Sequence, residues 1–292
     1  MAVVESPAAR IGALLGVPVA EVRVVGERHG FRHLRGTLAD GRAIFVKASV
    51  GGDNKDAFAA EANGLRWLAE ARAVPVPEVL GVDESTLVIE LLPEDAPSSA
   101  AARAFGAALA RMHAVGAPAF GAPWPGYIAS LPLDNTPRGQ PGDDDWGSWY
   151  TERRIVPYLR RARADGALTG SDAREVQAVV DRIGELAGPP EPPSRIHGDL
   201  WAGNVLWSGG RAALIDPAAH GGHRETDLAM LALFGAPYLD EIVSAYTEAT
   251  PLAAGWRSRV PLHQLHPLLV HVCLFGPSYT PQLIAAAREC RE

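Results

Sequence analysis

The residues that point most clearly to chemistry are an acid and an amide five positions apart, followed by a second acid. The segment His197–Asn204 reads H-G-D-L-W-A-G-N, and Leu214–Asp216 reads L-I-D. Kinase catalytic loops have the pattern H-x-D-x-x-x-x-N, followed by a strand that ends in a metal-binding aspartate. Oxygen ligands suit a hard cation such as Mg²⁺. We therefore expect Asp199 to meet an acceptor hydroxyl, and Asn204 and Asp216 to hold Mg²⁺ on the phosphates of ATP.

A lysine earlier in the chain is the candidate ligand of those phosphates. It ends the apolar run Ile44–Lys47, as the phosphate-binding lysine of a kinase ends its third strand. The chain has 27 basic residues, of which Lys47 and Lys55 are the only lysines. Because arginine is the usual cation of this chain, a lysine in an apolar strand suggests a site that needs a compact ammonium group.

The partner of Lys47 follows from helical periodicity. Residues Asn54–Ala71 predict a helix with Phe58, Leu65 and Leu68 on one apolar stripe, and Glu61 lies on the same stripe. A carboxylate on a buried face is costly unless it is paired. We expect Glu61 to pair with Lys47, unless the stripe is only half buried and Glu61 reaches solvent.

Two further segments are candidates for nucleotide binding. Val22–Gly36 predicts a strand, a turn and a strand, and places Gly30 where backbone N–H groups approach the phosphates, although it matches no standard glycine-rich motif. Glu90–Pro93 ends the last predicted strand of the first lobe. We expect the hinge between lobes there, with backbone groups of Glu90 and Leu92 pairing with adenine.

Length and composition set the class of protein. The chain has 292 residues, 47% hydrophobic and 21% charged, which suits two lobes that each bury a core. The net charge of −7 argues against a nucleic-acid partner. We find no signal peptide, and no uninterrupted apolar run near the ~20 residues that span a bilayer. Cys273 and Cys290 form neither a disulfide framework nor a zinc motif, so a reducing cytoplasm and no membrane are expected.

The order of predicted elements indicates an α+β fold with two lobes, residues 1–92 and 93–292, like that of protein kinases. The first lobe has a five-stranded antiparallel sheet and one helix, and the second is mainly helical. Residues 117–143 contain six prolines and four glycines, so they predict a long irregular segment that walls a substrate cleft. The predicted strands are Val22–Val25, Phe31–Leu38, Ala43–Ala48, Val76–Val82 and Thr86–Leu91; the predicted helices after Pro97 are Ser98–Ala114, Asp145–Ala164, Ser171–Ala187, Arg224–Phe234, Tyr238–Ala249, Gly255–Phe275 and Pro281–Arg288.

These residues resemble one family of small-molecule kinases. His197–Asn204 is similar to the H-G-D-L-W-x-G-N motif of the fructosamine kinase (ketosamine 3-kinase) family, a branch of the aminoglycoside phosphotransferase and choline kinase-like fold. Trp201 is the most specific residue of that motif. The resemblance covers roughly residues 20–285 and includes Phe45–Lys47, Ile215–Ala218, Arg224–Ala229, Leu233–Gly235, Tyr246, Pro251–Leu252, Phe275–Gly276 and Tyr279.

The resemblance implies ATP and Mg²⁺ as cofactors and a role for each matching residue. Asp199 would orient and deprotonate the 3-hydroxyl of the sugar, while Trp201 would offer a flat face to the sugar ring or its amine; the alternative for Trp201 is a core position. Asn135 would contact the substrate. Asp227 would hold the backbone of the catalytic loop, and His197 would be a structural histidine.

The resemblance also implies a small-molecule ketosamine, or a glycated amine or protein, as the partner. Many family members have a cysteine in the phosphate loop that links dimers, whereas Gly30-Phe31 stands near that place here. We therefore expect a monomer or a dimer without a disulfide. Leu133 stands where the family has glutamine, so some substrate contacts would differ.

Two alternatives remain open. One is an aminoglycoside- or choline-type phosphotransferase, whose site needs acids for a polycation; Asp143–Asp145 could supply them, although such a run is also typical of a solvated helix cap. The other is a catalytically inactive nucleotide-binding module. Such a module usually lacks one of the lysine, base or metal ligands, and all of these residue types are present here.

Overall fold

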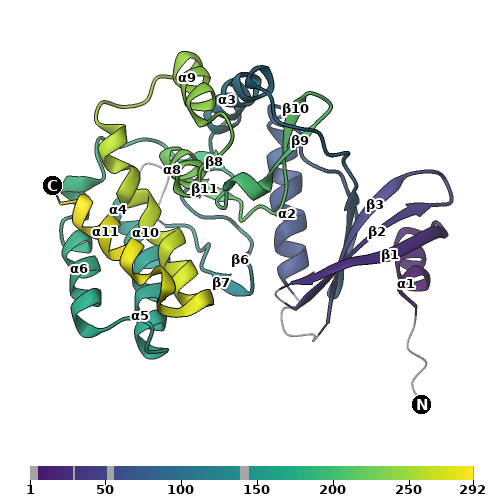
Figure 1. Cartoon of the computed structure of the whole chain (residues 1–292), viewed down its shortest axis with the longest axis horizontal. Helices are drawn as coiled ribbons and strands as arrows, with labels where there is room; N and C mark the ends of the chain where they lie inside the picture. The colour runs from purple at the N-terminus through teal and green to yellow at the C-terminus, as the bar shows by residue number, and fades with distance from the viewer. Residues whose placement is uncertain (1–5, 29, 51–55, 139–144, 292) are drawn as a thin grey trace.

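The structure is a computed structural model that describes residues 6–28, 30–50, 56–138 and 145–291. A smaller lobe contains a sheet, and a larger lobe contains most of the helices (Figure 1). The two-lobed α+β arrangement expected from the sequence is therefore confirmed.

The N-lobe sheet has five antiparallel strands in the spatial order β1-β2-β3-β5-β4. All five predicted strands are present, but β1 extends three residues beyond each end of the predicted Val22–Val25, and β4 begins at Val79 rather than Val76. Pro77 has no N–H to donate to the sheet, which is consistent with the later start. The strands are β1 (Val19–Arg28), β2 (Phe31–Leu38), β3 (Ala43–Ser49), β4 (Val79–Asp83) and β5 (Thr86–Glu90).

Two helices cover opposite faces of this sheet, as Figure 1 shows: α1 (Pro7–Leu15) and α2 (Ala57–Glu70). Ile44 and Val46 of β3 pack in a cluster with Ile11 of α1. Phe45, between them in sequence, packs in the cluster of α2. Because successive strand residues face opposite sides, Lys47 points toward α2. The sheet thus places the lysine beside the helix that carries Glu61.

Helix α1 was not predicted. Its signals are local: Ser6 Oγ accepts a hydrogen bond from Ala9 N at 3.2 Å, Pro7 is at the first helical position, and Gly16 ends the helix at φ +67°. These are recognised start and stop signals. Helix α2 follows the prediction from Ala57 onward, while residues 54 and 55 lie outside the described residues.

The C-lobe helices match the predicted ones within a few residues. The predicted helix Asp145–Ala164 is interrupted by a π-helical turn at Thr151–Ile155. The predicted helix Ser171–Ala187 is split in two. The helices are α3 (Ser99–Ala114), α4 (Trp146–Tyr150), α5 (Val156–Ala164), α6 (Gly170–Val180), α7 (Ile183–Leu186), α8 (Glu225–Leu233), α9 (Leu239–Ala249), α10 (Trp256–Phe275) and α11 (Thr280–Glu289), with 3₁₀ turns at Ala202–Asn204 and Gly276–Tyr279.

Short strand pairs carry the polar loops of the C-lobe. The segment predicted to be irregular contains a hairpin of β6 (Gly126–Ile128) and β7 (Leu131–Leu133). The catalytic segment lies between paired strands: β8 (Ser194–Ile196) pairs with β11 (His220–Gly222), and β9 (Val205–Ser208) pairs with β10 (Arg211–Leu214). The predicted catalytic loop therefore leaves β8, and the predicted metal-binding acid follows β10.

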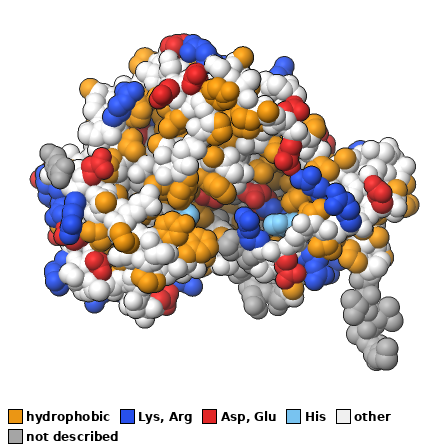
Figure 2. Space-filling view, viewed as in Figure 1, with side chains coloured by type: hydrophobic (Ala, Val, Ile, Leu, Met, Phe, Trp, Pro, Cys, Tyr) orange, Lys and Arg blue, Asp and Glu red, His pale blue; other side chains and the backbone are white. Residues whose placement is uncertain are grey.

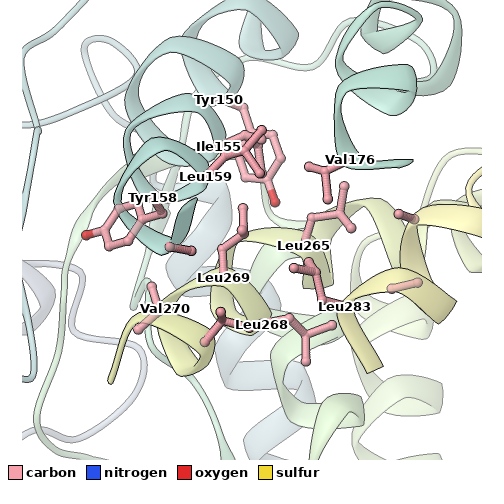
Figure 3. Close-up of a cluster of buried hydrophobic side chains, with 14 of the residues drawn as sticks. Tyr150, Ile155, Tyr158, Leu159, Val176, Leu265, Leu268, Leu269, Val270 and Leu283 are labelled. Carbon is pink, nitrogen blue, oxygen red and sulfur yellow. The ribbon is translucent and has the colours of Figure 1, made fainter. Parts of the chain in front are cut away.

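The largest C-lobe core surrounds α10 (Figure 3). Leu265, Leu268 and Leu269 of this helix are fully buried against side chains of α5 and α11. By length and composition alone, the helical stretch Trp256–Glu289 could cross a membrane. A buried core helix of a globular domain has the same composition, and that is the position of α10 in this fold.

Candidate active site

A cleft with a volume of about 450 Å³ lies where the N-lobe hairpin, α2 and the catalytic segment meet. Figure 2 shows this hollow between the lobes, with charged side chains inside it. Seven residues predicted from the sequence line it together: Lys47, Glu61, Asn135, Asp199, Trp201, Asn204 and Asp216.

Lys47 is the centre of a buried ion-pair network. Its Nζ donates to both carboxylate oxygens of Glu61 at 2.8 Å and to Asp216 Oδ1 at 2.7 Å. The expected Lys47–Glu61 pair is therefore present. Burial lowers the pKa of Lys47, but the negative charges of Glu61 and Asp216 outweigh that effect and raise it above its ordinary value. Lys47 is thus a fixed cation in the cleft.

Asp216 is held in an unusual backbone conformation. Its φ is +55°, in the left-handed region that non-glycine residues rarely adopt. Burial is the largest single effect on Asp216 and raises its pKa, but the charge and the hydrogen bond of Lys47, together with smaller effects of His33 and His197, lower the pKa below its ordinary value. The carboxylate is therefore kept ionised, and Lys47 contacts only one of its two oxygens.

The pKa of Asp199 is shifted in the opposite direction from that of Asp216. Burial, followed by repulsion from Asp216, raises its pKa to about 7. Asn204 Nδ2 donates to the backbone oxygen of Asp199 at 2.8 Å and to its Oδ2 at 3.1 Å. Asp199 is therefore a carboxyl group poised near neutral pH, as a general base requires.

Asp227 holds the backbone of the predicted catalytic loop. Its carboxylate accepts the backbone N–H of His197 at 2.7 Å and that of Gly198 at 3.0 Å. His197 is fully buried, and its Nε2 lies 2.9 Å from the oxygen of Ile215. Both residues thus have the structural positions expected from the sequence.

A second layer of this support was missed by the sequence analysis. His113 Nε2 lies 3.1 Å from Asp227 Oδ2, and His113 Nδ1 lies 2.8 Å from the hydroxyl of Tyr246. The two residues come from α3 and α9, more than 100 positions apart. No local sequence pattern marks such a contact.

The donor set suits a magnesium ion. Asn204 uses its amide nitrogen to hold Asp199, which leaves its Oδ1 as the atom able to bind a cation. Asp216 similarly offers its second oxygen. A carboxylate oxygen and an amide oxygen are ligands that Mg²⁺ accepts.

Trp201 lies at the surface of the cleft and is 36% exposed, so it is not a core residue. Its six-membered ring folds over Gly203, where any Cβ would collide with it. The ring edge contacts Phe234 in a T-shaped arrangement with centroids 6.4 Å apart. The tryptophan thus presents part of its surface to the cleft beside Asp199.

Asn135 is buried at the back of the cleft. Its Oδ1 accepts a hydrogen bond from Arg154 Nη2 at 2.7 Å. Arg154 comes from the π-helical turn, and its Nη1 donates to the backbone oxygen of Asp134 at 2.6 Å. Arg154 was missed by the sequence analysis, and it fixes the orientation of the predicted substrate residue.

Three predicted nucleotide-binding residues lie apart from this lining. Gly30 is in the β1–β2 turn at φ +81°, and the hairpin lines the cleft through Val25–Arg28 instead. Glu90 is exposed at the end of β5, and its carboxylate accepts the N–H of Glu78 at 3.3 Å. Leu92 is half-buried after β5.

In the acidic run Asp143–Asp145, Asp145 caps α4, whereas Asp143 and Asp144 lie outside the described residues.

Known proteins are similar to this chain over most of its length. A "Probable ketoamine kinase" of Enterococcus faecium is 32% identical over 244 residues, covering 83% of this chain and 85% of the relative. The ketoamine kinase YniA of Escherichia coli, also named "probable", is 33% identical over 260 residues, covering 86% and 85%.

Solved structures have the same fold. A "putative fructosamine-3-kinase" from Thermobifida fusca is 55% identical, with 98% of each chain covered and a TM-score of 0.93. The macrolide 2′-phosphotransferase MphH of Brachybacterium faecium is 19% identical, covers 95% and 96%, and has a TM-score of 0.58, so it supports the kinase-like fold alone. The model of the family described as "Fructosamine kinase" matches residues 20–290. The chain belongs to the fructosamine kinase family.

Proposed function

We propose that this protein transfers the γ-phosphoryl group of ATP to the 3-hydroxyl of a ketosamine. The observation that carries the proposal is Asp199, a carboxyl group with a pKa near neutrality, facing the same cleft as the Lys47–Glu61–Asp216 network and the exposed Trp201. The network suits a nucleotide triphosphate, and the base suits an alcohol acceptor.

Each side chain has one role in this reaction. The 3-hydroxyl oxygen attacks the γ-phosphorus, its proton passes to the Asp199 carboxylate, and the bond to the oxygen that bridges to the β-phosphorus breaks, which releases ADP. Lys47 binds phosphate oxygens and is kept in place by Glu61. Asn204 and Asp216 would hold Mg²⁺, which neutralises phosphate charge when bound.

The remaining predicted residues keep their proposed roles. Gly30 belongs to the turn over the phosphates, and the backbones of Glu90 and Leu92 would pair with adenine. Asn135 would contact the acceptor through Nδ2, because Arg154 occupies its Oδ1. The sugar would rest against Trp201.

The product explains a use for this reaction. Phosphate is a better leaving group than hydroxide, so a ketosamine phosphorylated on O3 can break down and release its amine. We therefore propose deglycation of amine metabolites or proteins as the role, in a reducing cytoplasm. The cysteines are one half-buried and one buried thiol, which supports a monomer or a dimer without a disulfide.

A phosphate-transfer assay tests the proposal. ADP release is measured with ribulosamines and fructosamines of small amines, and with kanamycin as the antibiotic acceptor. We expect turnover of a ketosamine and weak or no turnover of kanamycin. Robust kanamycin phosphorylation without ketosamine turnover would favour the aminoglycoside-type alternative.

Asp199→Asn is the decisive variant in this assay. Loss of a general base costs roughly 10²–10⁴-fold in kcat, whereas ATP affinity should remain because Asp199 meets the acceptor. Asp240→Asn, an exposed acid of α9 outside the cleft lining, is the matched control. A variant at position 199 that keeps more than half of its kcat would refute the assignment.

A further inference from the structure

A second hollow opens from the catalytic base onto the C-lobe. It has a volume of about 230 Å³ and shares Arg28, Ile128, Ala129, Asp199 and Trp201 with the main cleft. From there it runs along α8 and α10 to the 3₁₀ turn at Gly276–Tyr279. We call it the aromatic groove, and its main lining side chains are Trp201, Phe234, His271, Leu274, Phe275 and Tyr279.

The rings of the groove form a continuous series that starts beside Asp199. After the Trp201–Phe234 contact, the centroids of Phe234 and His271 are 5.0 Å apart. His271 in turn lies 5.5 Å from Phe275 and 4.8 Å from Tyr279. These spacings are typical of packed aromatic clusters. The groove wall is therefore preassembled.

The aromatic side chains of the groove are unusually open to solvent. Four aromatic residues are exposed among the described parts of the chain, and three of them, Trp201 (36%), Phe234 (37%) and Phe275 (49%), line the groove. The fourth, Tyr238, lies outside it. Figure 2 shows hydrophobic side chains gathered on the C-lobe side of the hollow. Clustered exposed apolar side chains of this kind mark binding surfaces.

The charge of the groove argues against a polycation. Asp199 is the single acid among its described lining residues, and Arg28 is a basic one. Burial lowers the pKa of His271, and this effect exceeds the opposing effect of the hydrogen bond between Nδ1 and the backbone oxygen of Pro267, so His271 adds no acid to the groove. The main cleft differs, because Lys47 pairs with both Glu61 and Asp216 and its one positive charge balances only one of the two carboxylates. The positive charges of an acceptor with several ammonium groups would meet few carboxylates in the groove.

We propose that the aromatic groove binds an apolar, preferably aromatic, substituent on the amine of the acceptor ketosamine. This inference rests on the proposed function, because the groove begins at Asp199 and Trp201, where the sugar would be held. If the amine of the bound ketosamine points toward the groove, a substituent on that amine would contact the series of aromatic rings. The substrate class is then ketosamines of neutral amines with an apolar side group.

Paired probes test the groove. Binding of the fructosamines of benzylamine and of methylamine is measured by calorimetry, and ADP release is measured with the same compounds. Burial of a phenyl ring against several aromatic side chains predicts about tenfold tighter binding and a similarly higher kcat/KM for the benzylamine adduct.

Variants of the groove residues test whether the preference for the benzylamine adduct depends on the groove. Phe234→Ala and Phe275→Ala should each reduce the benzyl-to-methyl ratio at least threefold. Phe275→Ala, whose ring packs on His271 and Tyr279, should also leave the constants for the methylamine adduct unchanged. Tyr238→Ala is the matched control, since it removes an exposed aromatic ring outside the groove and should leave the ratio intact.

The outcomes separate the two proposals. Tighter binding of the benzylamine adduct that depends on Phe234 and Phe275 supports the proposal for the groove, even if neither adduct is phosphorylated. In that case the proposed kinase function is wrong and the proposal for the groove stands. Equal binding of both adducts, or a preference that survives both variants, overturns the groove, whether or not the adducts are phosphorylated.

Discussion

At the scale of single residues, Lys47 shows why one cation is not replaceable by another. Its Nζ lies within 2.8 Å of three carboxylate oxygens, and its side chain is 9% exposed. Lys47→Arg keeps the charge but introduces a longer, planar group that cannot occupy the same point. We expect roughly a 10²-fold loss in kcat/KM for ATP. Steady-state kinetics with thermal unfolding as the folding control measure this, and an unchanged KM for ATP with normal kcat would exclude the role.

The position of the Trp201 ring depends on a glycine. Since Trp201 folds over Gly203, a methyl group at position 203 must push the ring aside. We expect Gly203→Ala to raise KM for a ketosamine about as much as Trp201→Ala, roughly 3- to 10-fold from a lost stacking contact. KM for ATP should change little in both variants. Trp201→Phe, which keeps an aromatic face, is the control that should lose least.

The grouping of these side chains in one cleft could be predicted from the sequence because it depends on short, fixed spacings, whereas their chemical roles stay predictions. Asp199, Asn204 and Asp216 follow from one motif, and Glu61 follows from the period of one helix. By contrast, the partners that fix them come from distant segments. Arg154 and His113 carry no signal in the sequence, and the family match of Tyr246 does not indicate its partner. Only packing brings Arg154 to Asn135, and His113 to Asp227 and Tyr246.

At the scale of elements, α3 and α9 cross so closely that one position must lack a side chain. A Cβ on Gly106 of α3 would collide with the carbonyl oxygen of Ile242 in α9. We expect Gly106→Ala to lower the free energy of unfolding by about 1–3 kcal/mol, because the helices must separate. Urea unfolding measures this loss.

The control uses the same substitution in open space. Gly184 of α7 is exposed, and a Cβ there would meet nothing within 4 Å. Gly184→Ala should therefore leave stability unchanged or raise it by up to about 1 kcal/mol through helix propensity. Equal effects of the two substitutions would show that the α3–α9 crossing tolerates a methyl group.

Most elements could be predicted, and the differences have local causes. The β6–β7 hairpin was hidden in residues 117–143 because its strands are three residues long and lie among prolines and glycines. The π-helical turn at Thr151–Ile155 follows no sequence period, but it carries Arg154 toward Asn135. Such an irregular turn near the cleft is typical of functional positions.

At the scale of the whole molecule, buried neutral histidines make folding sensitive to acid. Burial, reinforced by the positive charge of Arg154, lowers the pKa of His220 to about 3. Burial and the neighbouring His263 lower the pKa of His223 to about 3. Glu225 differs, because His263 Nε2, 3.4 Å from the carboxylate, and two hydrogen bonds from Arg259 together overcome burial and lower its pKa to about 2. Its stabilising effect therefore persists down to pH values near 4.5.

The sign of the pH effect follows from these values. Below about pH 6.5 the unfolded chain binds protons at the two histidines and the folded chain does not, so stability falls as the pH is lowered from 6.5 toward 3. We expect a loss of about 1 kcal/mol for each histidine between pH 7 and 5.5, measured by urea unfolding at both pH values. His220→Asn should reduce this loss by about 1 kcal/mol, because Asn can still donate to the oxygen of Ala218 but does not titrate. A free energy of unfolding that is equal at pH 7 and 5.5 would show that these histidines are protonated in the folded protein.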